Sequence, residues 1–159
     1  LAEQQILYAR AAMERELGLT FFESGVTPPL LSPAMFESEV APFLQQIFEA
    51  TTTSNSSRPH LVIGGNTLGI LDEMLACDPD FIICPYETDQ TAFLNHLGKR
   101  DRPKVRVNMN PDALKTDEPD IINKELTRVR ELAFECPTAI AVGGIVPYDA
   151  DPEILKPHI

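Results

Sequence analysis

Short apolar segments recur along this chain, and glycine, asparagine or proline follows them before a stretch with helical spacing begins. Short apolar runs bounded by turn residues are typical of β-strands, and apolar residues that repeat every three or four positions are typical of helices. A chain that repeats strand, turn and helix builds a parallel sheet with helices on its outside. The five segments that we interpret as strands are Leu19–Phe22, His60–Ile63, Phe81–Cys84, Val105–Asn108 and Ala139–Val142.

Local signals mark the ends of the predicted helices. Ser32 is placed as an N-cap before Pro33, and Asp89 is placed to cap the helix that contains Phe93. Gly18 and Gly98 are placed to end helices. We therefore expect helices at 2–17, from Pro33 to about Ile47, at Leu68–Leu75, between Asp89 and Gly98, and from about Pro119 to Phe134.

Composition narrows the choice of partners. The 159 residues carry a net charge of −11, so the chain repels phosphate backbones and anionic lipid, and we expect a small-molecule substrate rather than nucleic acid or a membrane. No apolar run approaches the ~20 residues that cross a bilayer, and the amphipathic N-terminus does not resemble a signal peptide. The three cysteines are widely spaced, which argues against a disulfide framework and against a Cys-x-x-Cys metal site. These features favour a cytoplasmic protein.

The length suits one domain with a hydrophobic core. A closed eightfold barrel usually needs about 250 residues, whereas this chain has room for about five strand–helix units. The chain also starts at Leu1, without a methionine. We therefore expect residues 1–159 to form a single domain that is a portion of something longer.

The loops that leave the strands are the first place to look for chemistry, because parallel α/β folds carry their active sites there. Glu23 and Ser24 follow the first strand. Glu23 can hold a cation or accept a proton, and Ser24 can donate a hydrogen bond; the alternative is a turn with a solvated carboxylate. Tyr86 and Glu87 follow the third strand and either bind a substrate hydroxyl or ring, or lie on the surface without a ligand.

Asparagine and glycine follow the other strands. Asn66 and Asn108 either shape turns or donate their amides to a substrate oxygen, whereas Asn110 is interpreted as fixing the turn before Pro111. Glycines let the backbone approach a bound group closely, although no glycine-rich nucleotide-binding pattern is present. The predicted substrate-binding residues are therefore Ser24, Gly64, Asn66, Glu87, Asn108, Gly143 and Gly144.

Several of these turn motifs occur in a characteristic order. They are Phe22-Glu-Ser-Gly25, Leu31-Ser-Pro33, Val62-Ile-Gly-Gly-Asn66, Val107-Asn108-Met-Asn110-Pro111 and Gly143-Gly-Ile-Val-Pro147. In this order they resemble the uroporphyrinogen decarboxylase superfamily, which also contains the cobalamin (corrinoid)-dependent methyltransferases. The resemblance covers nearly the whole chain. It implies strands four to eight of a distorted (β/α)8 TIM-barrel-like fold, that is, the C-terminal five-eighths of the barrel.

The resemblance implies one of two activities. The decarboxylases remove acetate carboxyl groups from a tetrapyrrole without a cofactor. The methyltransferases move a methyl group between a corrinoid protein and a thiol or other acceptor, usually through zinc. The positions that resemble their zinc ligands are Val62, Gly64 and Gly143 or Gly144, and none of these side chains can bind a metal.

Some demethylating members of the superfamily use a Glu/Glu/His zinc set, which Glu23, Glu39 and His60 would have to supply. We do not favour it, because Glu39 is expected in the middle of a helix and His60 at the wrong end of its strand. The cysteines Cys77, Cys84 and Cys136 are expected as small core residues.

We expect a methyltransferase-type enzyme that acts with a corrinoid protein, in which Glu23, Tyr86 or a residue outside this piece of chain protonates the leaving group. The histidine that the decarboxylases carry in the last loop is replaced by Gly143, and the chain lacks a basic cluster for a polycarboxylate. One alternative is a uroporphyrinogen decarboxylase in which Ser24 contacts a substrate carboxylate. The alternative of another class is a binding module that kept the barrel and lost catalysis.

Overall fold

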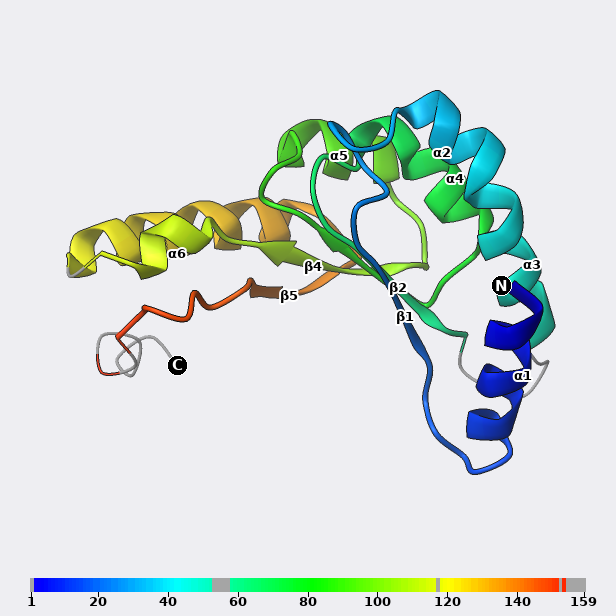
Figure 1. Cartoon of the computed structure of the whole chain (residues 1–159). Helices are drawn as coiled ribbons and strands as arrows, with labels where there is room; N and C mark the ends of the chain where they lie inside the picture. The colour runs from blue at the N-terminus through cyan, green and yellow to red at the C-terminus, as the bar shows by residue number, and fades with distance from the viewer. Residues whose placement is uncertain (1, 53–57, 117, 152, 154–159) are drawn as a thin grey trace.

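The protein is an α/β fold built on one parallel sheet. The computed structural model describes residues 2–52, 58–116, 118–151 and 153. Its five strands lie in the order in which they occur in the sequence, with helices between them (Figure 1). The strands are β1 (Thr20–Glu23), β2 (His60–Ile63), β3 (Phe81–Cys84), β4 (Lys104–Asn108) and β5 (Ala139–Gly143).

Every neighbouring pair of strands is parallel, which confirms the prediction from the apolar segments. Parallel neighbours require a crossover, and right-handed crossovers between strands in sequential order keep the connecting helices on one side of the sheet. Figure 1 shows α2 through α6 following one another along that side. The helices are α1 (Ala2–Met13), α2 (Pro33–Glu39), α3 (Ala41–Thr51), α4 (Leu71–Ala76), α5 (Gln90–Leu97) and α6 (Pro119–Glu135), and the 3-10 turns are η1 (Leu68–Ile70) and η2 (Pro111–Leu114).

The core lies between the helices and one face of the sheet. Alternate strand residues point to opposite faces, so one set from each strand meets the helices. On β2, β3 and β4 this set is fully buried, and Phe21 of β1 packs against Phe48 of α3 with a ring separation of 5.3 Å. The members of the set are Leu61, Ile63, Ile82, Cys84, Val105 and Val107.

The opposite face of the sheet is not covered by a helix within the described residues. Phe22 is 67% exposed there, Val62 and Arg106 are half-buried, and Ala141 is exposed. We call this surface the open face; a row of adjacent positions on it runs from Phe22 through Val62 and Ile83 to Arg106 and Ala141. Parallel sheets are normally covered on both faces, so the open face is the unusual surface of this fold.

Most helix-capping signals have the predicted effect. The Ser32 hydroxyl accepts a hydrogen bond from the Met35 N–H at 3.3 Å, and the Asp89 carboxylate accepts one from Ala92 N–H at 3.0 Å. Gly98 ends α5 with a φ of +61°, a conformation that favours glycine.

Three helix predictions were wrong in their bounds. The first helix ends at Met13 rather than at 17, and turns carry the chain to β1. The helix expected from Pro33 divides into α2 and α3, because Pro42 in the first turn of α3 has no N–H for a helical hydrogen bond. The segment Leu68–Leu75 likewise divides into η1 and α4.

Within the described residues, no helix combines the length and apolar character that crossing a membrane requires.

Candidate functional site at the carboxyl edge of the sheet

The parallel register brings the trailing ends of all strands to one edge of the sheet. Glu23 pairs with Ile63, Cys84 with Val107, and Asn108 with Gly143, so the loops that follow leave the sheet at the same level. We call this edge the rim. It contains Glu23–Ser24, Gly64–Asn66, Pro85–Thr88, Asn108–Asn110 and Gly143–Gly144. All of the predicted site residues therefore belong to the rim.

Side-chain hydrogen bonds join the first three loops of the rim. Thr27 Oγ1 donates to the Gly64 carbonyl at 3.1 Å, and Thr88 Oγ1 donates to Asn66 Oδ1 at 3.2 Å. Gly65 has a φ of +81°, and a Cβ atom at this position would overlap the Thr27 hydroxyl. The Asn66 side chain is exposed and its oxygen is engaged with the neighbouring loop, which supports the turn-shaping interpretation of this residue.

A buried glutamine joins the ends of β3 and β4. Gln90, the first residue of α5, is only 5% exposed. Its amide donates to the carbonyl oxygens of Cys84 at 3.3 Å and of Asn108 at 2.7 Å, and its Oε1 accepts from Arg128 Nη1 at 2.9 Å. One side chain therefore connects two strands of the rim with α6.

Arg128 is in turn held by Glu125. The Glu125 carboxylate accepts from Arg128 Nε at 2.8 Å and Nη2 at 2.7 Å, and from the Asn110 N–H at 2.6 Å. Burial alone would raise the pKa of Glu125, but the hydrogen bonds from Arg128 and Asn110, with the positive charge of Arg128, together lower it from its ordinary value. Asn110 Oδ1 also accepts from Asp112 N–H at 2.9 Å, as expected for a residue that fixes the turn.

The two residues predicted as proton donors are not brought together. The Tyr86 ring lies 6.0 Å from the guanidinium carbon of Arg128, so it packs toward α6 on the helix side of the sheet. Glu87 beside it is exposed. Glu23 is half-buried and lines a groove of about 390 Å³ between α1 and β1, with Tyr8 and Phe22 also on its wall. Desolvation by burial raises the pKa of Glu23, which favours its protonated form.

Sequence reasoning missed Arg106, a cation on the open face. Its Nε donates to Asn108 Oδ1 at 3.0 Å, and its side chain runs past Gly143. Asn108 is thereby buried at the rim with both its backbone and its side chain engaged. The alternation in Lys104-Val-Arg-Val-Asn108 was the available signal, since it puts the arginine opposite the buried valines.

The structure does not support a zinc site. Among the described residues, no group of three or more His, Cys, Asp or Glu side chains is arranged to hold a metal ion. His60 begins β2, at the far end from the rim, and its ring lies 5.1 Å from that of Phe81. Glu39 is exposed on α2, where it accepts from the Ser38 hydroxyl. The usual ligand positions carry valine and glycine, so we derive no chemistry through zinc.

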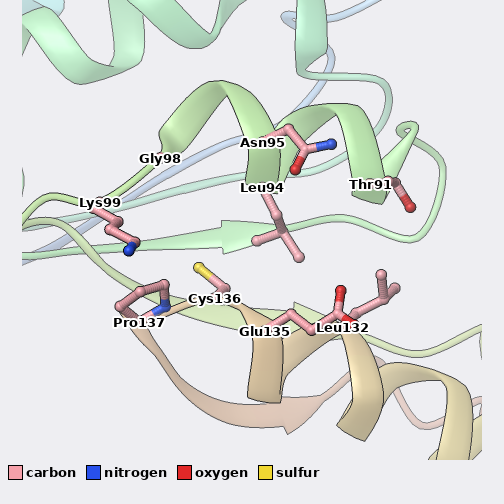
Figure 2. Close-up of a pocket in the computed structure, with 9 residues that line it drawn as sticks. All are labelled: Thr91, Leu94, Asn95, Gly98, Lys99, Leu132, Glu135, Cys136 and Pro137. Carbon is pink, nitrogen blue, oxygen red and sulfur yellow. The ribbon is translucent and has the colours of Figure 1, made fainter.

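The cysteines are buried and unpaired, as predicted. Burial raises the pKa of both Cys77 and Cys84 to about 12, so these thiols are not poised as nucleophiles. Cys136 lies at the base of a groove of about 210 Å³ between α5 and α6. Figure 2 shows Leu94 and Leu132 pointing toward one another across this groove, which belongs to the outer helix layer rather than to the open face.

Neither models of known protein families nor curated protein sequences match this chain. Its function is therefore argued from its residues and their geometry.

Proposed function

We propose that this chain forms consecutive strand–helix units of a (β/α)8-type barrel of the uroporphyrinogen decarboxylase superfamily. Two features support this proposal. The five parallel strands lie in sequential order with helices along one side, which is the arrangement of an arc of such a barrel. The open face would then line the barrel interior, which explains why it carries both apolar side chains and a charged one.

We infer that the enzyme is a corrinoid-dependent methyltransferase whose substrate binds at the rim. The observation that carries this inference is Glu23, a half-buried carboxyl group at the end of β1 with a raised pKa. A carboxyl group whose pKa is raised by burial suits general acid catalysis better than a fully solvated one. The environment of Glu23 favours it over Tyr86 in this role, since Tyr86 is engaged with Arg128.

The proposed reaction breaks the bond between a methyl group and an oxygen or nitrogen atom of a small substrate. A reduced corrinoid on the partner protein would accept the methyl group, and Glu23 would give a proton to the leaving oxygen or nitrogen atom. Solvent would then return a proton to Glu23. An ether or amine donor does not need activation as a thiolate, and no group of three or more potential metal ligands is found among the described residues.

The test is methyl transfer to free cob(I)alamin by the intact protein under anaerobic conditions, with a panel of methyl ethers and methylated amines. Consumption of cob(I)alamin is followed by absorbance, and the demethylated product by mass spectrometry. Glu23→Gln should lower the rate by about 10²- to 10⁴-fold, as is usual for loss of a general acid. Glu49→Gln, a change of the same kind at an exposed position of α3, should leave the rate unchanged. Equal rates for the two variants would remove Glu23 from the mechanism.

Decarboxylation of a tetrapyrrole remains the second candidate, and Arg106 is the observation that favours it. The Arg106 guanidinium, which forms no ion pair with any described residue, and the exposed hydroxyl of Ser24 are both suited to a carboxylate substrate. Incubation with uroporphyrinogen, followed by mass spectrometry for loss of CO2, tests this candidate directly. A protein that binds a small ligand and gives neither product would instead be the non-catalytic module.

A further inference from the structure

Arg106 is a positive charge for which the described residues provide no counter-charge. Its one hydrogen bond within the described residues is the one from Nε to Asn108 Oδ1, and it forms no ion pair there. Both terminal nitrogens of the guanidinium are therefore without a partner. Unpaired charges are costly when they are removed from water, and this side chain is half-buried.

The position of the side chain is fixed by its neighbours. Asn108 holds Nε from the same strand, two residues further on. On β5, Gly143 leaves the space through which the side chain passes, because a Cβ atom there would lie 3.0 Å from Arg106 Cδ. The stem of Arg106 is thus enclosed between two rim residues, and its fork is left free for a ligand.

The side chains beside Arg106 on the open face are apolar. Ile83 and Ala141 are its direct neighbours across the sheet; Ile83 is only 4% exposed, whereas Ala141 is exposed. Beyond Ile83 the row continues to Val62 and Phe22, and Phe22 is 67% exposed. Adjacent strands lie about 4.8 Å apart, so the row from Ile83 to Phe22 is about 10 Å long and its far end lies about 14 Å from the strand that carries the arginine.

We propose that the open face binds an organic carboxylate, with the carboxylate on the Arg106 guanidinium and an apolar body over Ile83, Val62 and Phe22. A guanidinium matches a carboxylate through two parallel hydrogen bonds, and the apolar row gains by being removed from water. Glu23 shares a side of β1 with Phe21, on the opposite face of the sheet, so this carboxylate site is separate from the one proposed for methyl transfer. The carboxylate proposal does not depend on which bond is broken at Glu23.

The probe is 2-naphthoate, which carries a carboxylate on a flat apolar body of two fused rings. Its neutral analogue 2-naphthalenemethanol lacks the charge, and acetate lacks the apolar body. We expect the intact protein to bind 2-naphthoate about tenfold or more tightly than either compound, as measured by calorimetry or by ligand-observed NMR.

Two variants distinguish a specific role of Arg106 in binding from the general effect of a positive charge on the protein. Arg106→Gln should weaken 2-naphthoate binding by about tenfold or more, because charged hydrogen bonds are lost. Lys104→Gln removes the same charge from the same strand and the same face, but at the exposed end away from the rim, and should change binding by less than about twofold.

Gly143→Ala keeps the charge and displaces the side chain that carries it. It should also weaken binding. Far-UV circular dichroism and thermal unfolding show whether each variant is folded. If Arg106→Gln does not fold, 2-naphthoate binding is measured with Arg106→Lys instead. The lysine variant keeps the charge without the planar fork and should bind 2-naphthoate more weakly than the wild type.

The proposal is overturned if the alcohol binds as tightly as the carboxylate, if acetate binds as tightly as 2-naphthoate, or if Lys104→Gln weakens binding as much as Arg106→Gln does. These measurements use no corrinoid. Carboxylate binding without methyl transfer would overturn the methyltransferase proposal alone. Methyl transfer that depends on Glu23, without carboxylate binding at Arg106, would overturn this inference alone.

Discussion

The buried amide of Gln90 offers the sharpest test of how the rim is held together. Gln90→Met keeps the length and approximate volume of the side chain and removes its hydrogen-bonding groups. The variant loses two donated hydrogen bonds, to the carbonyl oxygens of Cys84 and Asn108, and one accepted from Arg128. The two carbonyl groups lie at the buried ends of neighbouring strands, where water does not easily replace the amide.

The loss of stability depends on whether each former hydrogen-bond partner of Gln90 finds another partner in the variant. A buried hydrogen bond that is lost with its partner left behind costs about 1–1.5 kcal/mol, so the two carbonyl groups together account for about 2–3 kcal/mol. Arg128 contributes little, because its side chain is 40% exposed and stays paired with Glu125. A loss of that size lowers the melting temperature of a protein of this length by about 4–12 °C.

The assay is urea and thermal unfolding followed by far-UV circular dichroism, since the chain contains no tryptophan. Gln46→Met is the matched control, because it is the same substitution at an exposed position of α3 and should change the unfolding free energy by less than about 0.5 kcal/mol. If the two variants are equally stable, Gln90 does not hold β3 and β4 together and our account of the rim is wrong.

Three further predictions concern the rest of the described chain. Gly65→Ala should destabilise the protein by about 1–2 kcal/mol or more in thermal unfolding, because it forces alanine into a left-handed backbone and against a neighbouring hydroxyl, whereas Gly18→Ala, with open space around it, should stay within about 0.5 kcal/mol. The pKa of Glu125 is lower in the folded protein than its ordinary value of 4.5. The ionised carboxylate therefore stabilises the fold above that value, and this contribution is lost as the pH falls through the folded pKa. Glu125→Gln should be less stable than the wild type at pH 7, and the difference in unfolding free energy should shrink on acidification. Cys77 and Cys84, whose pKa values are raised to about 12, should react with iodoacetamide at pH 8 only after denaturant is added, as read by mass spectrometry; rapid alkylation of the native protein would contradict their burial.

The strand predictions were accurate because they rest on local pattern. Each of the five apolar segments became a strand, and each bound lies within one residue of the prediction. Helix caps were likewise readable, since Ser32 and Asp89 need only the backbone three residues ahead. Pro42 indicates a break between α2 and α3, but the apolar spacing that continues across this proline predicts a single helix.

The candidate site was predictable only in part. The rule that parallel strands present their trailing loops together correctly placed Ser24, Asn66 and Asn108 at one edge. It could not show that Tyr86 packs against a helix residue 42 positions later, or that Arg106 forms no ion pair with any described residue. Both facts depend on which surfaces face one another once the helices have packed.

By itself, the sequence determined the alternation of strands and helices, because hydrophobic periodicity and capping residues act over a few positions. The tertiary structure alone decided how the rim is held: Gln90 meets Asn108 18 residues away and Arg128 38 residues away. Such contacts depend on strand register and on the path of each crossover, which no local pattern encodes. The same is true of the open face, where the binding role that we propose for Arg106 depends on the glycine and apolar side chains that neighbouring strands place beside it.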